Sequence, residues 1–136
     1  MTRTAFSLLL LAVFGSAAQR TNEASFVGTW EAKIKDRVFL VLKISYDGKL
    51  TGTMSGVSVS TDDDGNVTDA EPAGKDSPIH DLKVDGDRLT FVESKGSDSD
   101  VEPDKCEMKL TGEGVAEFRL LDDPDAKLNP IVLRRR

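Results

Sequence analysis

The chain has 136 residues, a length that fits one folded domain, and its 24 acidic residues outnumber 18 basic ones to give a formal net charge of −6. An acidic balance of this kind argues against binding to nucleic acid or to an anionic membrane surface. A single cysteine and a single histidine exclude an internal disulfide framework, a cysteine-rich zinc site and a multi-histidine metal centre.

Residues 1–18 have the pattern of a signal peptide. Arg3 supplies a positive charge, residues 5–14 form an apolar run, and small residues follow as far as Ala18. The run is shorter than the ~20 apolar residues that a membrane-spanning helix needs. A buried N-terminal helix is the alternative interpretation. We therefore expect a signal peptide over 1–18, a linker over 19–25, and a secreted or periplasmic domain over 26–136 that is not inserted into a membrane.

From residue 26 onward, apolar and polar residues alternate with the period of half-buried β-strands. In one such segment Leu40, Leu42 and Ile44 share a face, and Lys43 lies on the other. Glycine-containing turns at 47–48, 85–87 and 112–114 separate pairs of segments, as expected for hairpins. The pattern predicts eight strands, over residues 26–36, 37–46, 49–59, 79–84, 88–95, 105–112, 115–121 and 130–135.

One face of every predicted strand is apolar, so the sheet has to bury that whole face. We predict an all-β, eight-stranded up-and-down antiparallel β-barrel, because closure covers the apolar face and removes exposed edges. A two-sheet β-sandwich is the alternative. The short turns then lie at one end, the closed end. The reversal at Asp36-Arg37 and the longer loops 61–78, 96–104 and 122–129 lie at the other end, the mouth.

The three long loops are strongly acidic, with a summed net charge of −11. Residues 60–71 (STDDDGNVTDAE) can be aligned with a calcium-binding EF-hand loop, with Asp62 and Asp64 at its third and fifth positions and Glu71 at its bidentate twelfth. Ser60 stands where the first carboxylate should be. The sequence therefore predicts a weak Ca²⁺ site at Asp62, Asp64 and Glu71, with a mobile polar loop as the alternative. An acidic mouth also suits a cationic partner.

The sequence contains no recognisable set of catalytic residues. Cys106 lies on the apolar face of its segment, which indicates a buried thiol, and His80 is expected at a strand edge. Neither a nucleophile-elbow motif nor a glycine-rich phosphate loop is present. We predict that the protein is not an enzyme and has no cofactor apart from the possible Ca²⁺.

The segment Phe26-Val27-Gly28-Thr29-Trp30 resembles the start of the calycin barrels, since lipocalins, fatty-acid-binding proteins and avidins open with a similar Gly-x-Trp. Residues 47–53 (DGKLTGT) are similar to the early strands of avidins. Calycins often pack an arginine from the last strand over this tryptophan. The resemblance therefore implies a closed end built from Gly28, Trp30 and either Arg134 or Arg135. The chain also resembles small secreted bacterial barrels with repeated DGKLTGT and VDGDRLTF hairpins and no assigned activity.

Two functions remain open at this point. The first is a secreted, non-enzymatic barrel that binds a small apolar or amphipathic molecule in its mouth, and Gly28, Gly52 and Gly56 on the inward face favour it by leaving room inside. The alternative is an extracellular interaction or accessory module with a filled barrel and an acidic rim. A cavity of ~300 Å³ or more would favour the first.

Overall fold

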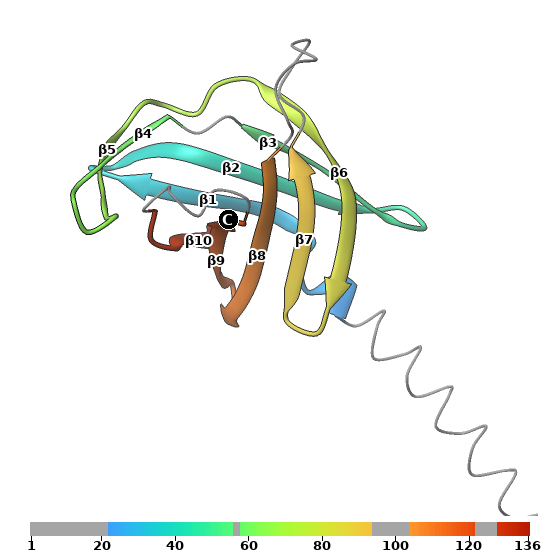
Figure 1. Cartoon of the computed structure of the whole chain (residues 1–136). Coiled ribbons are helices and arrows are strands. Elements are labelled where there is room, and N and C mark those ends of the chain that lie inside the picture. The colour runs from blue at the N-terminus through green and yellow to red at the C-terminus, as the bar shows by residue number, and fades with distance from the viewer. Residues whose placement is uncertain (1–21, 56–57, 94–103, 122–127) are drawn as a thin grey trace, which may run out of the picture.

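Eight strands close into an antiparallel barrel, which confirms the predicted all-β architecture and excludes the two-sheet sandwich (Figure 1). The computed structural model describes residues 22–55, 58–93, 104–121 and 128–136. Each barrel strand is hydrogen-bonded to the barrel strand that follows it along the chain, and the last strand pairs with the first. The barrel strands are β1 (Gly28–Ile34), β2 (Arg37–Tyr46), β3 (Leu50–Ser55), β6 (Asp76–Asp85), β7 (Arg88–Glu93), β8 (Asp104–Gly112), β9 (Val115–Leu120) and β10 (Ile131–Arg135).

The segment expected to be a long loop contains a second, two-stranded sheet, so that expectation was wrong. β4 (Val59–Thr61) pairs with β5 (Val67–Ala70), and β6 begins at Asp76, earlier than predicted. Val59, Val67 and Ala70 pack against the barrel core, and this burial favours a hairpin over a solvated loop. The predicted strand 49–59 accordingly ends at Ser55, while residues 56–57, where we expected a bulge, lie outside the described part of the chain.

The inside of the barrel is occupied by the chain's own side chains. Cys106 is among them, and it is buried with no disulfide, as the sequence predicted. The rings of Phe91 and Phe118 meet there with centroids 6.4 Å apart. The inward residues with at most 2% of their surface exposed include Trp30, Leu40, Leu42, Met54, Leu89, Phe91, Met108, Phe118 and Leu133.

The tight turns have the backbone that their sequences indicate. At the closed end Gly48, Gly86 and Gly114 have φ of 73°, 63° and 68°, a region that glycine enters without steric cost. At the mouth, Lys35 and Asp36 both have positive φ and make a two-residue reversal between β1 and β2. The reversal is thus one residue earlier than predicted.

Two seams of the barrel are paired over only short stretches. β3 meets β6 at three residue pairs, from Thr53 with Pro78 to Ser55 with Asp76. β1 meets β10 at two pairs, Trp30 with Arg135 and Glu31 with Arg134. The β3–β6 pairing stops towards the closed end and the β1–β10 pairing stops towards the mouth, and a groove lies beside each seam.

Candidate functional site

The closed end is organised around Trp30. Its side chain is fully buried, and its indole Nε1 donates a hydrogen bond of 2.9 Å to the carbonyl oxygen of Phe26. The guanidinium of Arg135 lies over the indole ring, 5.2 Å from the centroid, in cation–π geometry. At Gly28, a Cβ would lie only 2.9 Å from Cδ of Arg135, so the glycine leaves room for the arginine stem.

Of the two candidate arginines, it is thus Arg135 that covers the tryptophan. Arg134 follows the opposite parity and stands across from Glu31 on the outer face of the barrel. A single helical turn over residues 22–24 precedes Phe26, whose side chain is fully buried beneath the same end. The structure therefore brings Gly28, Trp30 and Arg135 into contact, and it places Arg134 elsewhere.

The three carboxylates predicted to bind Ca²⁺ are not brought together. Asp62 caps the tip of the β4–β5 hairpin, where its Oδ1 accepts hydrogen bonds from the backbone amides of Asn66, at 2.9 Å, and Asp64, at 3.0 Å. These bonds, led by that of Asn66, lower the pKa of Asp62. Glu71 lies at the other end of the hairpin, where its amide bonds to Ser58. Among the described residues, no three acidic, histidine or cysteine side chains are placed to hold one metal ion.

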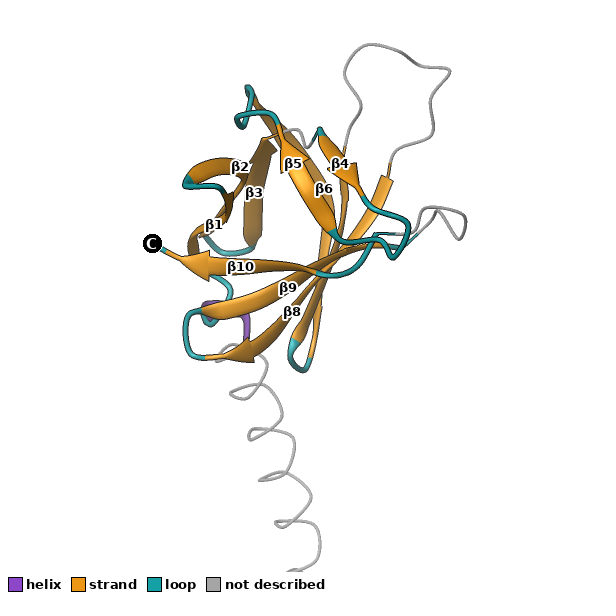
Figure 2. Cartoon of the chain, turned by 90° about the vertical axis from the view of Figure 1, so that its left-hand side faces the viewer, coloured by secondary structure: helices purple, strands orange, loops and turns teal. Residues whose placement is uncertain are grey.

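The β4–β5 hairpin lies at the mouth (Figure 2), and hydrogen bonds hold it on both sides. Asn129, just before β10, donates its backbone amide to Gly65 O at 2.8 Å and its side-chain amide to Asn66 Oδ1 at 2.7 Å. On the other side, Arg37 Nη1 donates to the carbonyl of Ala70 at 2.9 Å. Part of the segment expected as loop 61–78 therefore lies across the mouth.

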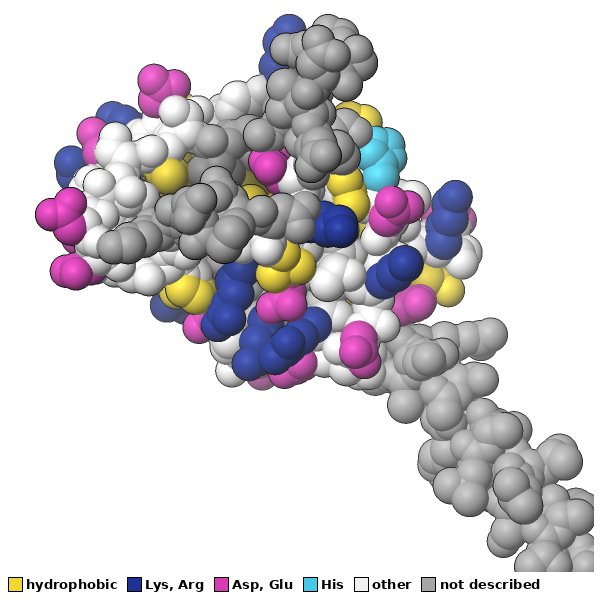
Figure 3. Space-filling model, viewed as in Figure 1, with side chains coloured by type: hydrophobic (Ala, Val, Ile, Leu, Met, Phe, Trp, Pro, Cys, Tyr) yellow, Lys and Arg dark blue, Asp and Glu magenta, His cyan; other side chains and the backbone are white. Residues whose placement is uncertain are grey.

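The acidic side chains of this hairpin are exposed to solvent (Figure 3). They belong to the loop 61–78, the first of the three acidic loops that we expected at the mouth. Residues 94–103 and 122–127, which make up most of the other two, lie outside the described residues. A cavity of about 210 Å³ remains between the hairpin, β1 and β10, lined in part by Phe39, Val67 and Ile131. This volume is below the ~300 Å³ typical of a small-molecule site.

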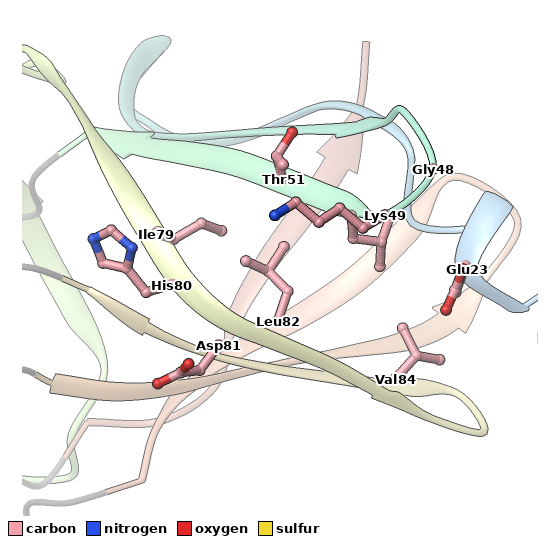
Figure 4. A pocket seen from close by; sticks show the side chains of 10 residues that line it. Glu23, Gly48, Lys49, Thr51, Ile79, His80, Asp81, Leu82 and Val84 are labelled. Carbon is pink, nitrogen blue, oxygen red and sulfur yellow. The ribbon is translucent and has the colours of Figure 1, made fainter.

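A larger groove opens at the β3–β6 seam towards the closed end (Figure 4), and we call it the seam groove. Its volume is about 430 Å³. Ile79 and Leu82 project from β6 into the space between the strands, and the Lys49 side chain reaches over the same space. Its residues are Glu23, Gly48, Lys49, Leu50, Thr51, Ile79, His80, Asp81, Leu82 and Val84.

The short paired part of this seam is held by a polar cluster on the outer face. Asp76 accepts hydrogen bonds from Lys43 Nζ at 2.9 Å and from Ser55 Oγ at 2.8 Å. The bond from Lys43 and then that from Ser55 lower the pKa of Asp76. This cluster joins β2, β3 and β6 at the end of the paired stretch that is farthest from the seam groove.

His80 and Asp81 do not form a catalytic pair within the groove. Both side chains point away from the groove (Figure 4), and both are exposed. Asp81 has φ of 55° and sits in an irregularity of β6 between His80 and Lys83, which brings Leu82 to the inner face. The geometry suits binding of an amphipathic group better than proton transfer.

Sequence reasoning missed the seam groove because it treated residues 79–84 as a regular strand. Ile79 and Leu82 are three apart, a spacing that breaks strict alternation and signals a bulge. No protein-family model, curated protein or solved structure matches the chain. No helix in the described ranges is long and apolar enough to cross a membrane.

Proposed function

We propose that this protein is an extracytoplasmic, non-enzymatic binding module of calycin-like type, and that its ligand is a small amphipathic molecule held in the seam groove. The calycin-like assignment is supported by Trp30 and Arg135 stacked at the closed end of an eight-stranded barrel. The extracytoplasmic location is supported by the signal-like pattern of residues 1–18.

The observation that carries the proposal is the composition of the seam groove. Leu50, Leu82 and Val84 are half-buried apolar residues on its inner side, and Lys49 and Thr51 are exposed at its rim. Its volume of about 430 Å³ exceeds the ~300 Å³ at which small-molecule sites begin. Its apolar side chains are accompanied by at least as many polar and charged ones, so the lining is amphipathic, which suits an amphipathic ligand.

The barrel interior is a poorer host for a ligand than the sequence suggested. Trp30, Leu42 and Phe91 are almost completely buried against other side chains, and none of them lines the seam groove. The β4–β5 hairpin covers the mouth, so a ligand would have to displace it to enter. We therefore place the ligand at the seam groove rather than in the mouth.

The charge at the rim indicates the polarity of the ligand. The ammonium group of Lys49 reaches over the apolar floor, the carboxylate of Asp81 points away, and the carboxylate of Glu23 lies at the other end of the groove from that ammonium group (Figure 4). An apolar body lying on Leu50 and Leu82 would bring a negatively charged end close to Lys49. Fluorescent amphipathic anions such as anilinonaphthalene sulfonate have this chemistry and serve as a probe.

The test is a fluorescence titration of the folded protein with this probe. We expect saturable binding that Leu82→Gln weakens at least about tenfold, because the substitution places an amide on the apolar floor. Leu121→Gln is the matched control, since Leu121 is 47% exposed and outside the groove. Loss of binding in Val67→Gln with no change in Leu82→Gln would place the ligand under the hairpin and refute the proposal.

A second function is favoured by the filled interior. A barrel packed with its own side chains provides a rigid scaffold for contacts with other macromolecules through its outer face and loops. The exposed carboxylates of the β4–β5 hairpin would then meet a cationic partner. Native mass spectrometry of the protein purified from its source separates the two: a retained small molecule supports the first function, and a retained polypeptide supports the second.

A further inference from the structure

The second open seam carries a concentration of positive charge on an otherwise acidic protein. Where β1 and β10 diverge, their outer faces and that of β2 form a groove of about 710 Å³, which we call the basic groove. Four cationic side chains line it against a single carboxylate. The residues are Glu31, Lys33, Val38, Val132, Arg134, Arg135 and Arg136.

Most of this positive charge is not neutralised within the protein. The carboxylate of Glu31 is engaged by Arg136, with Nη2 and Oε2 2.9 Å apart, and only 12% of the Glu31 side chain is exposed. Arg134 stands opposite Glu31 in register, yet neither Arg134 nor Lys33 has an ion-pair partner within the described residues. Both side chains are exposed, so their charges are available to a ligand.

The groove also has apolar surface and free strand edges. Val132 is 51% exposed, and the half-buried Val38 lies across the groove from it on β2. The ladder between β1 and β10 ends at Glu31 on the mouth side, so the β1 residues 32–34 have no β10 partner along the groove. Unpaired strand edges are the surfaces to which an extended peptide adds its own backbone.

The spacing of the charges fits an extended chain. Arg134 lies on β10 and Arg136 directly follows the strand, its amide still bonded to Thr29 O of β1, so the two arginines lie along one face with the ~6.8 Å period of a strand. Side chains on one face of an extended peptide have the same period. Guanidinium groups bind carboxylates through paired N–H donors in a fixed fork, which favours acidic residues as their partners.

We propose that the basic groove binds an extended acidic peptide segment of a partner protein, with carboxylates facing Arg134 and Lys33 and apolar side chains lying on Val38 and Val132. This site is separate from the seam groove, and neither proposal depends on the other. The interaction is charge-driven at an exposed surface, so it weakens as salt screens it.

The experiment is a fluorescence anisotropy titration with a labelled ten-residue peptide of alternating Glu and Val at low salt. We expect saturable binding that Arg134→Glu or Lys33→Glu weakens at least about tenfold. Lys83→Glu makes the same change of charge at an exposed lysine of β6 outside the groove, and it should change the dissociation constant less than about twofold. Circular dichroism of each variant establishes that it is folded.

Two further peptides test the apolar contacts and the sign of the charge. Replacing the valines by glycine should weaken binding, and replacing the glutamates by lysine should abolish it. Equal weakening by Lys83→Glu would reduce the effect to net charge and overturn the proposal. So would saturable binding of a sulfated polysaccharide under conditions where the Glu–Val peptide does not bind.

Discussion

Substitution of Trp30 tests the register of the barrel, because the residue contributes to stability in three separate ways. A buried aromatic side chain removes roughly 200 Å² from water, worth ~5 kcal/mol at ~25 cal/mol per Å² as an upper bound. Trp30 is fully buried, so Trp30→Ala should destabilise the protein by ~3–5 kcal/mol through lost burial and the cavity left behind. The loss is a large fraction of the ~5–15 kcal/mol that stabilises a typical domain.

The other two contributions can be separated by milder substitutions. Trp30→Phe keeps most of the apolar area but leaves the Phe26 carbonyl without its indole donor, which should cost ~1–3 kcal/mol. Arg135→Ala removes the cation–π contact, worth ~0.5–1 kcal/mol because the guanidinium is exposed. In Trp30→Ala the effect of removing Arg135 should largely disappear, since the two side chains interact with each other.

The assay is urea unfolding followed by far-ultraviolet circular dichroism. Fluorescence is unsuitable because Trp30 is the sole tryptophan of the chain and the variants remove it. The free energies of unfolding of wild type and variant are compared where both have the same slope against urea concentration, because an unchanged slope is consistent with two-state unfolding. A loss below about 1 kcal/mol in Trp30→Ala would mean that the side chain is not part of the core and would refute the register of β1.

Four further predictions concern other parts of the barrel. Gly52→Ala should destabilise by ~1–3 kcal/mol in urea unfolding, because a Cβ there would lie 2.6 Å from a backbone oxygen, whereas Gly112→Ala, with nothing within 4 Å, should be close to neutral. The pKa of Asp76 is lowered in the folded state, so its stabilising effect is complete above its unfolded value of 3.8 and is lost as pH falls below it; wild type and Asp76→Asn should converge in stability at low pH, and a constant difference would contradict this. Asn129→Ala should speed amide hydrogen exchange in β4 and β5 but not in β8, since it removes the side-chain bonds that fasten the hairpin. Melting curves in CaCl₂, MgCl₂ and NaCl at matched ionic strength should shift equally, because Asp62 is already engaged by the hairpin tip; a shift specific to Ca²⁺ would restore the metal site.

The barrel could be predicted because its strands obey simple local rules. Alternation in residues 38–46 and glycine-containing turns at Gly48, Gly86 and Gly114 determine both the inward faces and the direction of the chain. The β4–β5 hairpin escaped prediction because its acidic residues suggested a solvated loop. A few apolar residues, Val59 and Val67 among them, were enough to hold it on the core.

The grooves were harder to predict because they arise where strand pairing stops. Sequence patterns indicate which strands are neighbours but not over how many residues they remain paired. The choice of Arg135 over Arg134 likewise depended on the register between β10 and β1. For the acidic residues, the pattern indicated the ligands of an EF-hand loop, but it could not show that a hairpin separates Asp62 from Glu71.

The central claim is that the ligand binds in the seam groove, where β3 and β6 are unpaired, and does not enter the packed interior of the barrel. The most direct test is a methyl-resolved NMR titration of the folded protein with anilinonaphthalene sulfonate. We predict shifts of the methyl signals of Leu50, Leu82 and Val84, which line the groove, with little change at the fully buried Leu42 and Leu133. The opposite pattern, with the interior leucines shifting and the groove residues unchanged, would show that the ligand enters the barrel and would contradict the account.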